Sequence, residues 1–432
     1  MAHIAPFRGV RYAADRVGSL DRVVAPPYDV ISPEERAALV ARSPQNIVQV
    51  DLPTDDGDTR YERAGRLWRA WLADGIVRPD DEPALYFLEE RFTLPSGRAA
   101  VRHGLVTALA LESFGASTVA PHEQTFAGPK ADRLKLMRAT RANLSQVLML
   151  CRDAARRLDA AWEAVLRRPA GAETSAPDGN RRMWTVTDAD VISLARDVLA
   201  GSALTIADGH HRYETALTYR EECRARAGDG GAAEALMVYV SRMDDPDLVI
   251  LASHRIVSVT AALDFAAFRR LLGEHFDLTP VPGAAPAQWL ARHLVRRPDE
   301  PYRFGFFARP WGWLLATLRS WEASAPWIGP ARSEPWRRLD VSVLHELVLG
   351  HLAHGAAGGA DAIRQITYTI DPAEGQAAVE RSAADLVCMV PPTTSRQIAD
   401  IVQAGDTMPH KSTYFYPKLL TGLVMRSLDE PS

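Results

Sequence analysis

Apolar residues recur along the chain with two different spacings. From Tyr61 to Leu72 they stand three and four positions apart, at Leu67, Trp68 and Trp71, which predicts an amphipathic helix. The same spacing predicts helices over residues 132–144, 213–224, 264–272 and 342–352. Short apolar runs predict strands over residues 84–94, 104–111, 147–151, 203–207, 236–240 and 303–307. Helices and strands mixed in this order favour the α+β class.

Two local signals refine this pattern. Ser32, followed by Pro33 and Glu35, predicts a helix start, because the serine and glutamate side chains can cap each other's backbone N–H groups. Residues 169–180 combine Gly, Ala, Ser and Pro without periodicity, so we expect a surface loop there.

Length, charge and cysteine content narrow the classes of protein. A chain of 432 residues is longer than one hydrophobic core usually grows, so two or three packed units are expected. The net charge of -4 lacks the basic excess of a nucleic-acid-binding protein, so we expect no nucleic-acid partner. No apolar run approaches the roughly 18 residues of a membrane helix, and we expect no membrane partner. Cys151, Cys223 and Cys388 form no C-x-x-C pair, which fits a reducing cytoplasm.

The segment best suited to bind a ligand is Asp208-Gly209-His210-His211-Arg212, which lies between a predicted strand and a predicted helix. The first N–H groups of a helix lack intrahelical acceptors and align with the helix dipole, so they form a site for an anion such as phosphate. Gly209 permits a sharp turn, and Arg212 can donate two parallel hydrogen bonds to phosphate oxygens. The alternative is a plain turn with surface histidines and an ion pair between Arg212 and Glu214 or another acid.

Two further clusters have residue types suited to phosphate binding. Glu123 precedes Lys130 and Arg133, and this group could hold phosphates or a metal, or it could consist of solvated loop charges. The segment 406–413 resembles a P-loop but has His410 where the required glycine would stand. The hydrogen-bond donors here are Lys411, Ser412, Thr413 and the nearby Lys418. They could bind phosphate or a substrate carboxylate, or they could belong to a structural strand.

Two further histidines each stand next to a charged residue, without the spacing of a metal site. His254-Arg255 and His345-Glu346 are adjacent pairs, unlike the H-E-x-x-H arrangement that places two ligands on one helix face. We expect these four residues to have core or surface roles.

The turn resembles that of a known superfamily. The string from Ile206 to Ala216 looks like the phosphate-binding turn of ParB/sulfiredoxin-like proteins, and it is most similar to the Asp-Gly-His-His-Arg run of free-serine kinases. Sulfiredoxins have a cysteine where this chain has His210, so thiol-based chemistry is not implied.

A wider resemblance spans residues 25–418. Strings at 25–32, 121–125, 128–134 and 411–418 resemble the family labelled domain of unknown function 1015, some of whose members are related to serine kinases. The resemblance implies a ParB/sulfiredoxin-like nucleotide-binding core with additional N- and C-terminal α/β segments. We therefore expect an N-terminal α/β region over 1–185, a phosphate-binding unit over 186–262 and a C-terminal α/β region over 263–432.

The resemblance implies an ATP-dependent kinase that phosphorylates a small hydroxylated metabolite, with free L-serine as the first candidate. ATP, or ADP in its place, would be the donor, with Mg²⁺ as cofactor; the metal ligands are left unassigned. The expected catalytic residues are Asp29, Glu123 and His211, with Asp29 the first choice for accepting the hydroxyl proton. The expected phosphate-binding residues are Asp208 to Arg212, Lys130 and Arg133, and the expected substrate-binding residues are Lys411, Ser412 and Thr413. The alternative is a ParB-like nucleotide-binding or nucleotide-hydrolysing regulatory switch.

Overall fold

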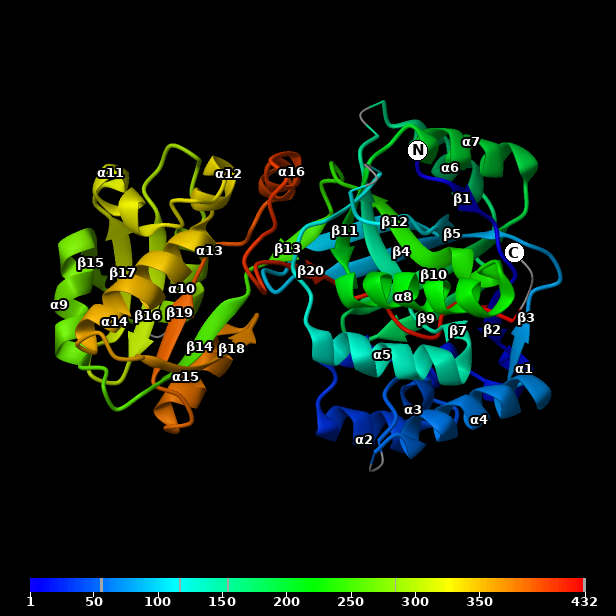
Figure 1. Ribbon diagram of the computed structural model, residues 1–432, viewed down its shortest axis with the longest axis horizontal. Helices are drawn as coiled ribbons and strands as arrows, with labels where there is room; N and C mark the ends of the chain where they lie inside the picture. Colours follow the sequence, from blue (N-terminus) through cyan, green and yellow to red (C-terminus); the bar gives the residue numbers. More distant parts are fainter. Residues whose placement is uncertain (55–56, 116–117, 154, 284, 430–432) are drawn as a thin grey trace. The chain divides into compact units, whose positions relative to one another are not determined.

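The computed structural model describes residues 1–54, 57–115, 118–153, 155–283 and 285–429 (Figure 1). Backbone contacts divide the chain into two compact units. Unit 1 contains the described residues of 1–121, 125–249 and 417–432, and unit 2 contains those of 122–124 and 250–416. Each unit combines helices with a large sheet, which confirms the expected α+β class. Both compact units combine segments that are distant in sequence. The expected division into three regions, with boundaries at residues 185 and 262, stays a prediction.

Unit 1 is built on a nine-stranded mixed sheet with the strand order β6-β11-β8-β12-β5-β4-β10-β9, and β1 pairs with β5. β11 runs parallel to β6 and antiparallel to β8, and β8 runs parallel to β12. The strands are β1 (Ile4–Ala5), β4 (Leu85–Thr93), β5 (Ala99–Ala110), β6 (Val119–Pro121), β8 (Val147–Cys151), β9 (Ala172–Ala176), β10 (Gly179–Val186), β11 (Leu204–Asp208) and β12 (Ala235–Arg242).

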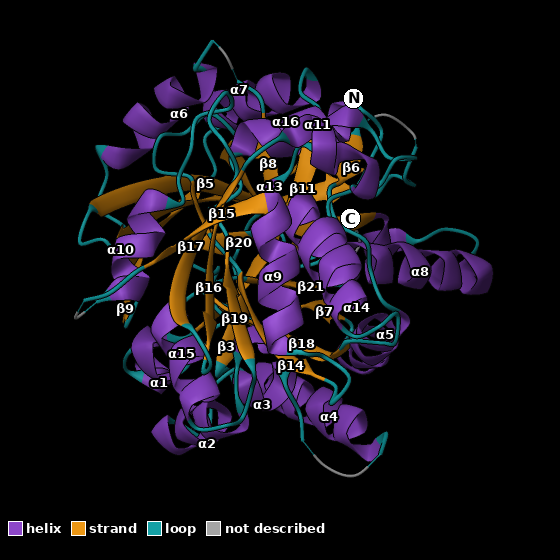
Figure 2. Cartoon of the chain, turned by 90° about the vertical axis from the view of Figure 1, so that its left-hand side faces the viewer, coloured by secondary structure: helices purple, strands orange, loops and turns teal. Residues whose placement is uncertain are grey.

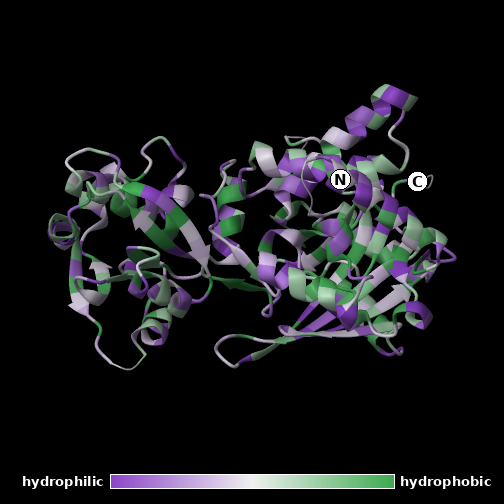
Figure 3. Ribbon diagram, turned by 90° about the horizontal axis from the view of Figure 1, so that it is seen from below, coloured by the Kyte–Doolittle hydropathy of each residue, from purple (hydrophilic) through white to green (hydrophobic). Residues whose placement is uncertain are grey.

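Helices cover one face of this sheet. Apolar residues of β4, β5, β8, β11 and β12 pack there against α6 (Arg157–Leu166), α7 (Ala189–Ala200) and the first turns of α8 (His210–Ala227). Figure 3 shows apolar and polar residues alternating along the helices of unit 1, as expected for helices with one buried face. The site-bearing turn between β11 and α8 is therefore anchored on both sides by core packing.

A second core of unit 1 lies around a four-stranded sheet of order β3-β2-β21-β7. Its strands are β2 (Gly9–Tyr12), β3 (Val77–Pro79), β7 (Ala142–Asn143) and β21 (Met425–Ser427). The helices of this region are α1 (Ala14–Val17), α2 (Pro33–Arg42), α3 (Val48–Asp51), α4 (Thr59–Ala73) and α5 (Ala127–Thr140), with the short η1 (Leu20–Arg22) and η2 (Tyr28–Val30). α5 packs against both α4 and α8, and η3 (Gly231–Glu234) follows α8.

Unit 2 contains a six-stranded, fully antiparallel sheet of order β15-β17-β16-β19-β14-β18. Its strands are β14 (His254–Val259), β15 (Phe276–Pro280), β16 (Arg303–Ala308), β17 (Gly312–Leu318), β18 (Ile363–Thr369) and β19 (Leu386–Met389), and a separate pair joins β13 (Val249–Leu251) to β20 (Tyr414–Tyr416). On one face, α10 (Pro286–His293) and α15 (Pro372–Glu380) enclose a core with Phe307, Val387 and Met389.

The remaining helices of unit 2 include an uncommon type. α9 (Phe265–His275) lies beside α14 (Ala353–Ala356), as Figure 2 shows. The chain enters α14 through a π-helix, η5 (Val343–Leu352), where a regular helix was expected over 342–352. The other short helices are α11 (Trp321–Ser324), η4 (Ala325–Trp327), α12 (Glu334–Arg337), α13 (Asp340–Ser342) and α16 (Ser395–Gln403). Because π-helices are rare and frequent at functional sites, η5 marks a region of interest.

Most elements expected from periodicity are present, and two expectations besides the regular helix over 342–352 were wrong. The capping box at Ser32 and Glu35 is formed. The segment 169–180 is not a loop, because β9 and β10 pair there as a hairpin on the large sheet. The helix expected over 132–144 ends at Thr140, because Arg141 adopts a left-handed conformation with φ 51° and its N–H bonds to the Met137 carbonyl. None of the helices in the described ranges has both the length and the apolar character needed to cross a membrane.

Candidate functional site

The turn between β11 and α8 has the geometry of an anion site. Gly209 has φ 95° and ψ 28°, and a Cβ at this position would lie 2.9 Å from Nε of Arg212. Only glycine therefore fits there without displacing the arginine. The N–H of Tyr213 bonds to the Gly209 carbonyl. The backbone N–H groups of His210, His211 and Arg212 precede that first helical hydrogen bond, at the positive end of an 18-residue helix.

Two cations converge on the carboxylate of Asp208 at the end of β11. Nζ of Lys418 donates to one oxygen at 2.9 Å, and Nη2 of Arg212 donates to the other at 3.0 Å. Arg212 also donates to the Ser145 hydroxyl and the Gln146 carbonyl. Burial alone would raise the pKa of Asp208, but Lys418 and Arg212 hold it well below its usual range. The centre thus has two cations and one ionised carboxylate, and this positive excess favours an anionic ligand.

A second charged group of unit 1 lies around Arg133 on α5. Its guanidinium donates to the Asp51 carbonyl at 2.7 Å and to Asp132, and it lies 3.8 Å from the ring centre of Tyr28. Burial raises the pKa of Asp51, and it raises that of Tyr28 to about 12, while Arg133 and Arg212 oppose both shifts. Arg133 is thus held by two acids, rather than pointing to solvent for direct phosphate contact.

Asp29, the expected proton acceptor, is exposed on η2 and adds negative charge to the same group. The charge of Asp29 raises the pKa of both Tyr28 and Asp51, whereas the charge of Arg212 lowers both. A cavity of about 40 Å³ joins the two groups. Its polar lining residues are Asp51, Arg133, Asn143, Ser145, Arg212, Thr140 and Thr215. This volume admits water but not a nucleotide, so any nucleotide must bind beside it.

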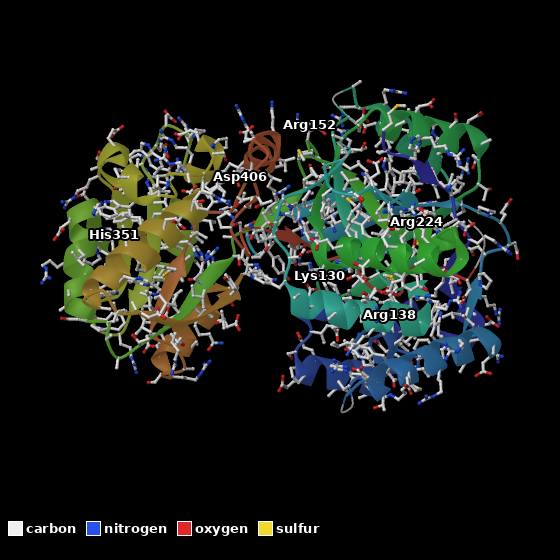
Figure 4. The ribbon with its side chains drawn as sticks, viewed as in Figure 1. Lys130, Arg138, Arg152, Arg224, His351 and Asp406 are labelled. Carbon is white, nitrogen blue, oxygen red and sulfur yellow. The ribbon has the colours of Figure 1, made fainter. Side chains whose placement is uncertain are left out.

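Lys130 and His211 lie at the junction of α5 and α8. Nζ of Lys130 bonds to Glu214 at 2.7 Å, and Figure 4 marks Lys130 near the start of α5. Nε2 of His211 accepts the N–H of Phe126 at 3.0 Å, which assigns the proton of the neutral ring to Nδ1. A cavity of about 400 Å³ adjoins Lys130 and Glu214 and is bordered by Phe114. It is large enough for part of a nucleotide.

The expected residues Glu123, Lys411, Ser412 and Thr413 belong to unit 2. Oε1 of Glu123 lies 3.0 Å from Nδ1 of His410 and accepts the backbone N–H of Lys411 at 2.8 Å. Lys411 has φ 54°, a left-handed conformation that side-chain-bearing residues rarely adopt. Ser412 is buried and donates to the Pro409 carbonyl, and Thr413 bonds to Nε2 of His122 at 3.1 Å. The structure therefore bonds the side chains of Glu123, Ser412 and Thr413 within a strained segment, whereas Lys411 is exposed and bonds through its backbone.

Beside this segment lies a fully buried arginine. Arg255 donates to Nε2 of His345 at 3.0 Å and to the Lys411 carbonyl at 3.3 Å, and among the described residues it forms no ion pair with a carboxylate. Burial lowers the pKa of Arg255 to about 10. Burial, reinforced by Arg255, lowers the pKa of His345 to about 3 and that of His254 to about 4. His345 is supplied by the π-helix η5, so the uncommon helix positions this contact.

Residues 4–342 match the family described as "Protein of unknown function (DUF1015)". The chain belongs to this family. The DUF1015 match includes Asp29, Glu123, the Asp208–Arg212 turn and Arg255, whereas Lys411 to Thr413 and Lys418 lie beyond it. No curated protein matches the chain.

Several solved structures resemble this DUF1015 protein at low identity. A conserved hypothetical protein from Pyrococcus furiosus is 12% identical, with a TM-score of 0.31, over 70% of this chain and 89% of its own. A free serine kinase in complex with AMP is 12% identical, with a TM-score of 0.32, over 71% and 89%. A C-terminally truncated SbnI from Staphylococcus aureus is 10% identical, with a TM-score of 0.34, over 73% and 85%. At these TM-scores the functional argument rests on the site of the DUF1015 chain itself.

Sequence reasoning missed part of both centres. Asp51, Ser145 and Gln146 stand in no motif, and only folding brings them to Arg212 and Arg133. Arg255 and His345 were expected to have core or surface roles, and the structure shows in addition that they bond to each other. Their adjacency to His254 and Glu346 gave no signal, because the contact joins a strand and a helix 90 residues apart.

Proposed function

We propose that this chain is an ATP-dependent phosphotransferase that phosphorylates the hydroxyl of a small metabolite. Free L-serine is our first acceptor, which would give O-phosphoserine, and ADP is a second candidate donor. We also assign the ParB/sulfiredoxin-like fold to the part of unit 1 around β11 and α8, on the resemblance of its turn. The cytoplasm is the proposed location.

The observation that carries the proposal is the Asp208–Arg212 turn. A left-handed glycine, three leading N–H groups of a long helix and two cations around one carboxylate together favour a phosphate group. The β- or γ-phosphate would bind the N–H groups of His210, His211 and Arg212. Lys130 would exchange Glu214 for a phosphate oxygen, and Arg133 would act by holding Asp51 and Asp132 in place.

Phosphoryl transfer also needs an acceptor for the hydroxyl proton. We assign this role to Asp29, which is exposed and belongs to the charge network of Arg212 and Asp51. The substrate oxygen would attack the γ-phosphorus, the bond from phosphorus to the leaving oxygen would break to release ADP, and the proton would pass to Asp29. Glu123 is our second candidate base, and His211 is proposed to orient the reacting groups. Lys411, Ser412 and Thr413 are the proposed contacts of the acceptor carboxylate.

Mg²⁺ would neutralise developing charge on the phosphates. The described part of the chain contains no group of three or more His, Cys, Asp or Glu side chains that could hold a metal ion by themselves. This fits Mg²⁺, which commonly binds through one or two carboxylates, water and the substrate phosphates.

The test is ³¹P NMR on the purified full chain with ATP, Mg²⁺ and a pool of free hydroxy amino acids. We expect a phosphomonoester signal that co-resonates with added O-phosphoserine. Asp29→Asn should slow its formation about 100-fold or more while leaving ATP binding intact. Glu34→Gln, at an exposed acid on the neighbouring helix α2, is the matched control and should leave the rate unchanged.

A second variant tests the arginine, and one result would redirect the proposal. Arg212→Lys keeps the charge but loses the fork of N–H donors, so it should weaken ATP binding in addition to slowing product formation. ATP binding by the unaltered chain without any phosphorylated product would contradict the kinase and favour the nucleotide-dependent switch.

A further inference from the structure

A cavity of about 410 Å³ opens in unit 1 where α6 leaves part of the large sheet uncovered. Its floor continues the main core, with Phe87 and Leu105 from the sheet and Leu158 from α6. Cross-strand pairing places Phe87 and Val240 on either side of Leu105, so one sheet face supplies this floor. The volume lies within the range of small-molecule sites.

This cavity is separate from the phosphate turn. Asp208 pairs with Leu148 near the start of β8, whereas Arg242, which borders the cavity, pairs with Cys151 at the end of β8. The two features therefore lie toward opposite ends of the same strand, about 10 Å apart along it. A ligand in the cavity would not occupy the turn.

One wall of the cavity is aromatic. The ring of Trp162 on α6 lies with its centre 4.5 Å from that of His103 and 4.7 Å from that of Phe87. Trp162 is half-buried, so it borders both the core and the cavity. Tryptophan has the most favourable ring face for attracting a cation.

The charged residues on the rim are unequally neutralised. Arg156 and Arg242 both pair with Asp159, and Arg242 also pairs with Asp244 outside the cavity. Asp247 pairs with Arg98. Asp245 accepts the backbone N–H of Asp247, and among the described residues it has no ion pair. The half-buried carboxylate of Asp245 thus borders the same cavity as the aromatic wall and forms no salt bridge there, although Arg242 and His103 offset part of its charge.

We propose that this cavity binds a small organic ammonium ion that bears an aromatic or other apolar group. The ammonium would pair with the Asp245 carboxylate and lie against Trp162, and the apolar group would cover Leu105 and Leu158. This would be a second ligand site of unit 1, and it does not depend on the proposed phosphotransfer.

Three probes that share a phenylethyl group test the contribution of the ligand's charge. Isothermal titration calorimetry on the full chain should detect binding of 2-phenylethylamine. The uncharged 2-phenylethanol should bind about tenfold more weakly, because it lacks the charge-assisted contact, and the anionic 3-phenylpropionate should not bind measurably. Equal binding of amine and alcohol, or no binding of the amine, would overturn the proposal without any variant.

One variant tests the contact of the ammonium with Asp245, and a second variant is its control. Asp245→Asn keeps the shape of the side chain and should weaken 2-phenylethylamine about tenfold while leaving 2-phenylethanol unchanged. Asp190→Asn, at an exposed acid on α7 away from the cavity, makes the same change in net charge and should have no effect. Weakening of the amine by both variants alike would mean that net charge, rather than this cavity, attracts it, and would contradict the assignment.

Discussion

The two units differ in the partners that they give to a charged side chain shielded from water. In unit 1, the carboxylate of Asp208 is matched by Lys418 and Arg212, so the acid stays ionised and the centre carries a surplus of positive charge. In unit 2, Arg255 is fully buried and has imidazole and carbonyl partners instead of a carboxylate. Removing a charge from water costs several kcal/mol unless an opposite charge compensates. In unit 1 a carboxylate is thus paired with two cations, whereas among the described residues of unit 2 no carboxylate forms an ion pair with Arg255.

The largest expected difference between the units appears in mild acid. The pKa values of His345 and His254 are lowered by burial and by Arg255, so in the folded chain both rings stay neutral well below pH 6.5. In the unfolded chain they take up protons near pH 6.5, and the stability that they contribute is present above that pH and is lost as the pH falls toward 4. The lowered pKa of Asp208 also makes stability fall with pH, but only below about pH 4, where the carboxylate takes up a proton in the unfolded chain.

We therefore expect the free energy of unfolding of unit 2 to fall by about 3 to 4 kcal/mol between pH 6.5 and pH 5. Urea unfolding at the two pH values measures it. The variant His345→Gln should reduce this dependence by about half, whereas the control His3→Gln, at an exposed histidine, should not change it. A loss that is the same in chains with and without His345 would contradict the assignment to that ring.

The next largest effect distinguishes the two centres by mutation. Asp208→Ala removes the carboxylate that neutralises Arg212 and Lys418, and it should lower the free energy of unfolding by about 2 to 3 kcal/mol. Arg255→Met replaces an uncompensated buried charge with an apolar chain and should change stability by less than about 1 kcal/mol in either direction. Urea unfolding at pH 7.5 compares them. Equal losses in the two variants would show that Arg255 is compensated as fully as Asp208.

A smaller effect tests the turn itself. Gly209→Ala forces a side chain into a left-handed conformation and against Arg212, so it should cost about 1 to 2 kcal/mol and weaken ATP binding. Gly128→Ala is the matched control, because its added methyl group on α5 meets no atom within 4 Å. It should be neutral or slightly stabilising. Unchanged ATP affinity in Gly209→Ala, measured by calorimetry, would argue against phosphate at this turn.

The smallest expected effect concerns the strained segment of unit 2. Lys411→Gly relieves the left-handed conformation and should raise the free energy of unfolding by about 0.5 kcal/mol, the balance of strain relief and added unfolded-state entropy. If Lys411 also contacts the acceptor, the same variant should raise the KM for serine without changing ATP affinity. A stabilised variant with unchanged KM would limit the residue to a structural role.

Sequence reasoning predicted the local part of the site well. The strand, glycine turn and helix from Leu204 to Arg224 follow from an apolar run, one residue without a side chain and helical periodicity, all of which are local signals. The hairpin was missed because the residues of β9 have low strand propensity, and β9 is held only by pairing with β10, which in turn pairs with β4. Arg212 was expected to face a ligand, yet its guanidinium bonds to Asp208, Ser145 and Gln146, partners that only the tertiary fold supplies.

Nucleotide phosphates are proposed to bind the first N–H groups of α8, and backbone amide signals can test this binding directly. The chain has 12 histidines, so selective ¹⁵N-histidine labelling gives a small set of backbone amide signals. Those of His210 and His211 can be assigned with the variants His210→Gln and His211→Gln. During titration with a non-hydrolysable ATP analogue and Mg²⁺, we expect these two signals to move further downfield than the other histidine amides. Saturable binding that leaves both signals in place and shifts those of His254 or His345 would contradict it.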